Sequence, residues 1–159
     1  MDETSVKVKG VWVYLSRAVD SQGNTIAFLL SAFRDTQAAK RFFAKALGAS
    51  HTMTPRVSTV DKNAAYPKAV KDLKAAGDLA TSCELRQSKY LTNLVEQDHR
   101  FIKRLVKPGM GFWSFETAWR TLQGYEAIHM IRKGQMQGVK KGNSPSQATF
   151  IAELFGVAI

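Results

Sequence analysis

The sequence predicts an α/β protein with a mixed five-stranded sheet and flanking helices. Two observations predict this fold. Before residue 32 the chain has three β-prone stretches joined by short turns, which is the pattern of an antiparallel meander. After residue 35, helical and strand-like stretches alternate, and helices in such an order pack on the faces of a sheet.

The three N-terminal stretches are Thr4–Val8, Val11–Val19 and Thr25–Ser31. They are rich in β-branched and aromatic residues, which favour strands. Lys9–Gly10 and the cluster Asp20–Asn24 between them are typical turn sequences.

A helix is expected to begin with Thr36 as its cap and to end at Leu47, before Gly48. A short strand at residues 56–60 leads directly to Asp61. The later elements up to residue 106 are a helix over 63–76, a fifth strand within 80–86, and a helix from Asn93 that stops before Lys107 and Pro108.

Ser114 is expected to cap a further helix with an apolar face of Phe115, Ala118, Trp119, Leu122, Tyr125 and Ile128. We expect residues 1–134 to form one domain, followed by a basic, Gly-rich linker over 135–146 and a short amphipathic segment over 147–155 within the remainder, 135–159. Three hairpin strands followed by helix, strand, helix, strand and helix is the order of a ribonuclease H-like fold.

Charge is the strongest property of the composition. The 159 residues carry a net charge of +10, and a strongly basic protein favours a polyanionic partner such as DNA. The single cysteine, Cys83, excludes an internal disulfide and a cysteine-rich zinc site. No apolar run approaches the ~20 residues of a membrane span. We therefore expect a cytoplasmic, DNA-binding protein without a membrane partner.

Three acids lie at the ends of predicted elements. Asp2 starts the first strand, Asp61 follows the fourth, and Glu96 lies in the helix after the fifth. If the first and fourth strands are neighbours, Asp2 and Asp61 meet, and the helix can bring Glu96 to the same place. Converging carboxylates repel unless a cation neutralises them, and Mg²⁺ prefers oxygen ligands.

Simpler roles exist for Glu96 and for a fourth acid, Asp20. Asn93 and Glu96 also form a capping-box pattern at the start of a helix. Asp20, an alternative first acid, lies in a turn where an aspartate has a structural reason to occur.

Several ordered motifs resemble the DDE-type insertion-sequence transposases of bacteria, in particular the cointegrate-forming IS-six / IS-twenty-six group. The motifs are residues 1–4, 14–23, 59–62, 93–99, 111–115, 124–127 and 131–135. Glu96 follows Asp61 by 35 positions, which is the spacing this family shows. The resemblance covers almost the whole chain, although Ser5, Ala27 and Val60 stand where the family usually has an aromatic, an acid and a hydroxyl residue.

The resemblance implies a catalytic core that cleaves DNA phosphodiesters at insertion-sequence ends and transfers the strands. It implies that Asp2, Asp61 and Glu96 are the catalytic acids, holding two Mg²⁺ ions or, as a substitute, Mn²⁺. It further implies a homo-oligomer in a DNA complex in the bacterial nucleoid. The family's N-terminal helix-turn-helix region is expected to be absent, which leaves a second interpretation. This is a truncated, non-catalytic remnant that binds DNA or full-length transposase subunits.

Lys103, seven residues after Glu96, matches a basic position that in related enzymes contacts DNA. Arg100 and Arg104 on the same helix, and Lys107 directly after it, are further DNA-binding candidates, and solvation is the alternative for each. His99 is expected to be an accessory residue that orients a neighbour or packs beside the site. Of the tryptophans, Trp12 and Trp119 are expected in the core, and Trp113 is left open for base stacking.

Overall fold

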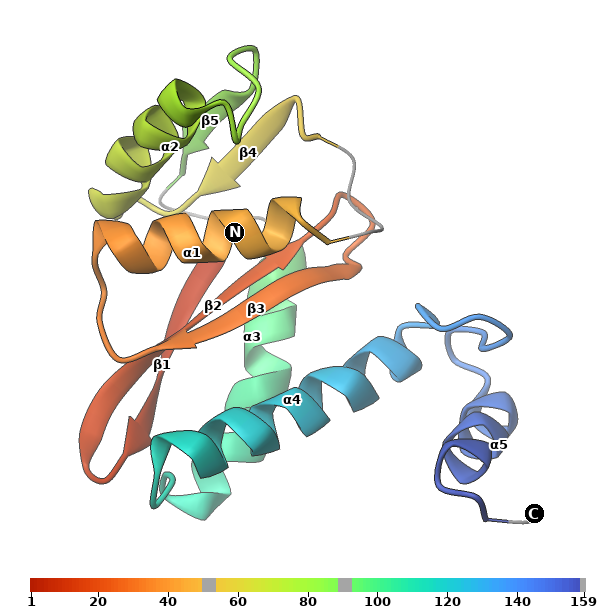
Figure 1. The fold of residues 1–159 in the computed structure, drawn as a ribbon. Helices are drawn as coiled ribbons and strands as arrows, with labels where there is room; N and C mark the ends of the chain where they lie inside the picture. Colours follow the sequence, from red (N-terminus) through yellow and green to blue (C-terminus); the bar gives the residue numbers. More distant parts are fainter. Residues whose placement is uncertain (50–53, 89–92, 158–159) are drawn as a thin grey trace. The chain divides into compact units, whose positions relative to one another are not determined.

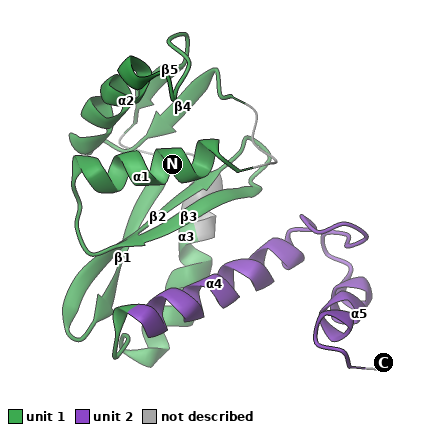
Figure 2. Ribbon diagram, in the orientation of Figure 1, with its two compact units in different colours: residues 1–115 green, residues 116–159 purple. Residues whose placement is uncertain are grey.

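The structure is a computed structural model that describes residues 1–49, 54–88 and 93–157, with side chains from residue 99 onward in the helix that begins at Asn93. The chain forms two compact units, residues 1–115 and residues 116–159 (Figure 2). Strands and helices follow the predicted order along the chain (Figure 1).

An antiparallel three-stranded sheet forms the N-terminal part of the first unit. Its strands are β1 (Asp2–Val8), β2 (Val11–Val19) and β3 (Thr25–Ser31), in the order β1-β2-β3. Lys9 and Gly10 both have positive φ angles, 50° and 79°, as a two-residue hairpin turn requires. The predicted meander is therefore confirmed, and β1 is an edge strand of this sheet.

Helix α1 (Thr36–Leu47) packs against this sheet with the apolar face that the sequence predicts. Its cap is Asp35 and not Thr36, because the Asp35 side chain accepts a hydrogen bond from the Ala38 backbone at 2.7 Å. Helix α2 (Ala65–Ala76) lies beside α1 in the same unit (Figure 1).

The other two strands of this unit, β4 (Val57–Val60) and β5 (Glu84–Gln87), form a separate parallel pair. The α/β class is confirmed, but the described residues do not form the single five-stranded sheet that we expected. The outer edge of β1 meets Phe112 at Val8, and β4 pairs with β5 instead of with β1. The start of β1 is joined to β4 through the Met1 terminal amine, which donates to the Thr59 carbonyl at 2.6 Å.

The core of the first unit lies between α1, α2 and β4. Phe43 and Tyr66 meet edge to face there, with ring centroids 6.0 Å apart. Cys83 is buried in the same cluster, as expected of a small apolar side chain.

Helix α3 (Asn93–Val106) continues into a single 3-10 turn, η1 (Lys107–Gly109). The following loop returns to the edge of β1, where the Phe112 backbone donates to the Lys7 carbonyl and accepts from the Lys9 N–H, both at 2.8 Å. Proline at position 108 ends α3 where the sequence indicates.

Gly111 is the residue that lets this loop approach β1. Its φ is +119°, and a Cβ there would lie 2.9 Å from the Lys7 carbonyl oxygen. We expect Gly111→Ala to destabilise the first unit by about 1–3 kcal/mol, since both the backbone conformation and the contact become strained. Gly109→Ala is the control, because no atom lies within 4 Å of a Cβ at Gly109. Urea unfolding of both variants measures the difference, and equal midpoints would contradict the prediction.

The second unit contains most of helix α4 (Phe115–Arg132) and helix α5 (Ser144–Leu154). The expected apolar face of α4 is only partly right. Ala118 and Leu122 are buried, whereas Ile128 is more than one-third exposed and the buried residues of α4 include Glu126. Helix α5 begins earlier than the predicted segment, because Asn143 caps it by accepting from the Ser146 N–H at 3.1 Å.

Candidate active site

Asp2 and Asp61 lie close together in the first unit. Asp2 is the first residue of β1, and Asp61 directly follows β4. The hydrogen bond from the Met1 amine to Thr59, two residues before Asp61, holds the start of β1 beside the end of β4. The two carboxylates are near enough for the charge of Asp61 to raise the pKa of Asp2.

The environment of Asp2 disfavours its charged form. Burial is the main cause that raises the pKa of Asp2, and repulsion from Asp61 adds to it. The Glu3 backbone N–H, which donates to Asp2 at 2.8 Å, and the positive charges of the N-terminus and Lys103 oppose the rise but do not cancel it. This is the kind of unbalanced carboxylate that a bound cation would stabilise.

His99 connects helix α3 to this site. Its side chain is 4% exposed, and its Nε2 lies 3.3 Å from Oδ2 of Asp2. His99 therefore lies beside Asp2, and the accessory role suggested by the sequence stays a prediction. Glu96 lies in α3 one turn before His99, and its side chain is outside the described part of the structure.

Two residues that sequence reasoning did not select also belong to this group. Arg34 forms ion pairs with both Glu3 and Asp61, and its NH2 group is 3.4 Å from Oδ2 of Asp61. Burial raises the pKa of Glu3, and the neighbouring Arg34 charge opposes this rise. In the sequence, the position of Glu3 next to Asp2 could have indicated that it belongs to the site. Arg34 lies in the loop before α1, and no sequence motif marked it.

Asp20 occupies the turn between β2 and β3. Its Oδ1 accepts from the backbone N–H groups of Gln22 and Asn24, at 2.8 and 2.9 Å, and its Oδ2 accepts from the Asn24 side chain at 2.9 Å. Burial acts to raise the pKa of Asp20, but these hydrogen bonds outweigh it and hold the pKa below its ordinary value. Asp20 thus has the turn-forming role that its position indicates, which supports Asp2 as the first acid.

Exposed cations follow His99 along the chain, namely Arg100, Lys103 and Arg104 in α3 and Lys107 in η1. Lys103 is the one whose charge acts on Asp2. Lys103 and Lys107 also line a groove between α3 and the edge of β1, whereas Arg100 and Arg104 do not.

The tryptophans differ from the expectation. Trp12 is 54% exposed and is therefore not a core residue. Trp113 is 88% exposed in the loop after η1, and Trp119 is half-buried in α4. The sequence placed Trp12 in the core because it lies within a strand, but β2 exposes this residue near the hairpin end.

The donors at the site suit a hard divalent cation. Asp2 and Asp61 offer carboxylate oxygens, which Mg²⁺ prefers, and the repulsion between them would fall on binding it. Among the side chains that the structure describes, no three His, Cys, Asp or Glu residues form a metal-binding group. Glu96 stays a ligand predicted from the sequence, and its side chain lies outside the described part of the structure.

The raised pKa of Asp2 predicts a specific pH dependence of stability. A group whose pKa is raised by folding binds its proton more tightly in the folded state. The stability that this protonation contributes is fully present below the ordinary pKa of 3.8 and is lost as the pH rises through the raised pKa. Asp2→Asn lacks this charge. We expect the variant and the parent chain to have similar melting temperatures at low pH, and the variant to be the more stable at neutral pH without metal. Scanning calorimetry in EDTA measures both, and a less stable variant at neutral pH would contradict the prediction.

Comparison with known protein families identifies the class of this chain. A family model described as a DDE domain matches residues 1–135, and the chain belongs to this family, the DDE domain of insertion-sequence transposases. No solved structure matches the chain.

The chain is similar to a transposase for the insertion sequence-like element IS431mec from Staphylococcus aureus, with 36% identity over 134 residues. It shares the same identity over the same length with the transposase for insertion sequence element IS257 in transposon Tn4003 of Staphylococcus aureus. These alignments cover 84% of this chain, and the chain spans 57% of the length of these relatives. An uncharacterized protein, pYV0051, of Yersinia pseudotuberculosis is 30% identical over 90 residues, covering 56% of this chain and 84% of that protein. In the described part of the chain, no helix is long and apolar enough to cross a membrane.

Proposed function

We propose that this chain is the catalytic core of a DNA transposase that cleaves DNA phosphodiesters at insertion-sequence ends and transfers the freed strands in a metal-dependent reaction. The observation that carries the proposal is the meeting of Asp2, Asp61 and His99 within a DDE domain. Three elements supply these residues, β1, the end of β4 and α3. Glu96 lies on the same helix as His99, one turn earlier, and is proposed as the third acid.

Asp2, Asp61 and Glu96 would hold Mg²⁺, or Mn²⁺ in its place, with two ions as the proposed number. When bound, these ions would supply activation of the attacking oxygen and stabilisation of the leaving oxygen in displacement at phosphorus. The carboxylates position this chemistry and do not attack phosphorus themselves. No covalent bond between protein and DNA is therefore required.

The chain's own residues have separate tasks in this proposal. His99 holds the Asp2 carboxylate in place from α3, at 3.3 Å. Arg34 holds Glu3 and Asp61, which keeps the second acid beside β4. Lys103, Arg100, Arg104 and Lys107 offer positive charge to the phosphodiester backbone.

The reaction has two displacements. Water attacks the phosphodiester at the element end, the P–O3′ bond breaks, and the strand that leaves carries a free 3′-hydroxyl. That hydroxyl then attacks a phosphodiester of target DNA and displaces another 3′-oxygen. The proposed partner is therefore DNA, bound by a homo-oligomer of the chain in the bacterial cytoplasm at the nucleoid.

The test is an assay of the purified chain on labelled duplex DNA and supercoiled plasmid. We expect nicking of the plasmid, and joining of a duplex with a free 3′-hydroxyl to it, in Mg²⁺ or Mn²⁺ and not in EDTA. A folded chain that does neither in either ion would refute the catalytic proposal and leave the non-catalytic alternative. Binding to DNA does not separate the two, since a net charge of +10 favours it in both cases.

A further inference from the structure

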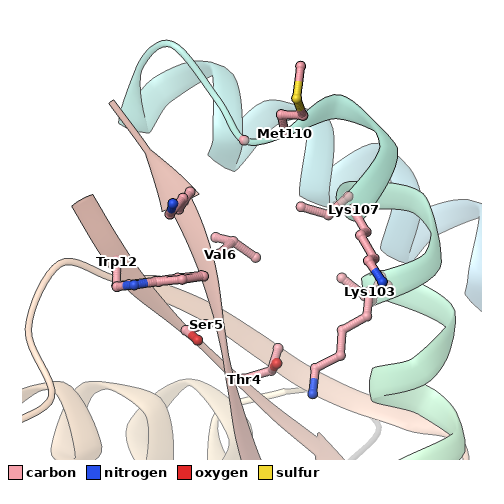
Figure 3. A pocket seen from close by; sticks show the side chains of 11 residues that line it. Thr4, Ser5, Val6, Trp12, Lys103, Lys107 and Met110 are labelled. Carbon is pink, nitrogen blue, oxygen red and sulfur yellow. The ribbon is translucent and has the colours of Figure 1, made fainter. Parts of the chain in front are cut away.

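A groove of about 610 Å³ lies between the edge strand β1 and the C-terminal half of α3, and we call it the β1–α3 groove. Its lining residues are Thr4, Ser5, Val6, Lys7, Trp12, Ile102, Lys103, Val106, Lys107, Met110 and Gly111. Figure 3 shows Trp12 on one side of β1, and on the other side Lys103 of α3 and Lys107 of η1. Consecutive residues of β1 line the groove although their side chains alternate between faces, so the groove bends around the edge of the strand.

The charge of this groove favours a polyanion. Lys7, Lys103 and Lys107 line it, and none of its lining residues is acidic. The main chain adds a donor. The Lys7 carbonyl and the Lys9 N–H point away from β2 and bond to Phe112. Along an antiparallel strand, the backbone groups of every second residue point to the same edge. The N–H of Ser5, two residues before Lys7, therefore also points to the open edge of β1.

The groove also has an apolar and aromatic surface, which a bare phosphate-binding site does not need. Trp12 is 54% exposed, and the Lys7 ammonium lies 5.3 Å from the centre of its ring. Met110 is 90% exposed at the rim, and Ile102 forms part of the buried wall. Cations interleaved with an exposed aromatic ring are the pattern that binds single-stranded nucleic acid, because an unpaired base stacks on the ring.

The size of the groove decides between paired and unpaired DNA. A cavity of this volume is in the range of pockets that hold small molecules, about 300–1,000 Å³, and a duplex is far wider. Internal bases of a duplex are stacked on both faces and cannot offer a face to Trp12. An unpaired nucleotide fits both the volume and the ring.

The groove is continuous with the candidate active site. Thr4, one of its lining residues, is two positions from Asp2, and the charge of Lys103 reaches the Asp2 carboxylate. We propose that the β1–α3 groove binds an unpaired end of a DNA strand, with phosphates beside Lys103 and Lys107 and a base against Trp12. This inference rests on the proposed function and names the form of DNA that the site receives.

The experiment measures binding of the full chain to two fluorescent duplexes of equal length, one blunt and one with a five-nucleotide single-stranded overhang, in EDTA. We expect the overhang to bind more tightly than the blunt duplex by on the order of tenfold, the gain from stacking one base. Trp12→Ala is expected to remove this preference while binding to the blunt duplex is unchanged, and Trp12→Phe to keep it. Trp113→Ala, which alters an exposed tryptophan outside the groove, is the matched control.

Two of the three groove lysines, Lys103 and Lys107, are tested by a different measurement. The double variant Lys103→Ala with Lys107→Ala is expected to lower the salt dependence of overhang binding by about two ion equivalents. Lys68→Ala with Lys71→Ala, on the exposed side of α2, is the control and should leave the overhang preference unchanged. Equal binding of the two duplexes by the parent chain, or an equal loss on both in Trp12→Ala, would overturn the inference.

The same binding assay with Asp61→Asn separates the two proposals. The overhang preference is expected to survive in this variant, because Asp61 does not line the groove. A chain that prefers the overhang but never joins DNA would refute the proposed catalysis and support the groove. A chain that joins DNA without any preference for the overhang would refute the groove and support the catalysis.

Discussion

Asp61→Asn is expected to lower metal-dependent strand transfer by about a thousandfold or more while the chain stays folded. A metal ion stabilises the charge of a phosphoryl-transfer transition state by several kcal/mol, and each 1.36 kcal/mol is a factor of ten in rate. Asparagine keeps the shape of the side chain but lacks the charge that would hold the ion. Because Asp61 follows β4 at the surface of the unit and forms an ion pair with exposed Arg34, the substitution removes no core contact.

The same loss is expected for Glu96→Gln, and Asp20→Asn is the matched control for both. Asp20 is also an aspartate in unit 1, but its carboxylate is engaged in the turn between β2 and β3. Strand transfer is measured with labelled 3′-hydroxyl duplexes in Mn²⁺, and circular dichroism checks the fold. Full activity in Asp61→Asn or Glu96→Gln would refute the assignment of that residue. A thousandfold loss in Asp20→Asn alone would make Asp20 the first acid.

The order of elements could be predicted because each depends on local sequence. The hairpin turn at Lys9–Gly10 and the break at Pro108 are set by backbone conformations that few residues adopt. The division of the five strands into two sheets could not be predicted in the same way. It depends on which strand edges meet in the folded chain, where β4 pairs with β5 and the start of β1 is joined to β4 through the Met1 amine and the Thr59 carbonyl.

In the candidate site, too, some residues could be predicted from the sequence and others could not. Asp2, Asp61 and His99 could be selected because they lie in short motifs that resemble the transposase family. Arg34 could not, since its ion pair with Asp61 joins residues 27 positions apart through folding alone. The exposure of Trp12 was also missed, because an aromatic residue in a strand suits either face of a sheet.

The core beneath the site leads to the largest expected effect on stability. We expect Phe43→Ala to lower the free energy of unfolding of the first unit by about 3–5 kcal/mol, the usual cost of removing a buried phenylalanine. Phe43 is 1% exposed and packs edge to face on Tyr66, so the cavity would be enclosed by α1, α2 and β4. Phe33→Ala is the control, since Phe33 is 69% exposed and its loss should cost less than about 0.5 kcal/mol.

Urea unfolding of the two variants measures this difference, and a loss below about 1 kcal/mol in Phe43→Ala would contradict it. We expect the same substitution to affect the position of the Asp61 carboxylate. Burial is the main cause that raises the pKa of the Tyr66 hydroxyl group, and the nearby charges of Asp61 and Glu3 raise it further. Loss of the Phe43–Tyr66 contact therefore weakens the packing of β4 and of Asp61, which follows it. We expect strand transfer by Phe43→Ala to fall even at temperatures where the variant is still folded, whereas Phe33→Ala keeps the activity of the parent chain.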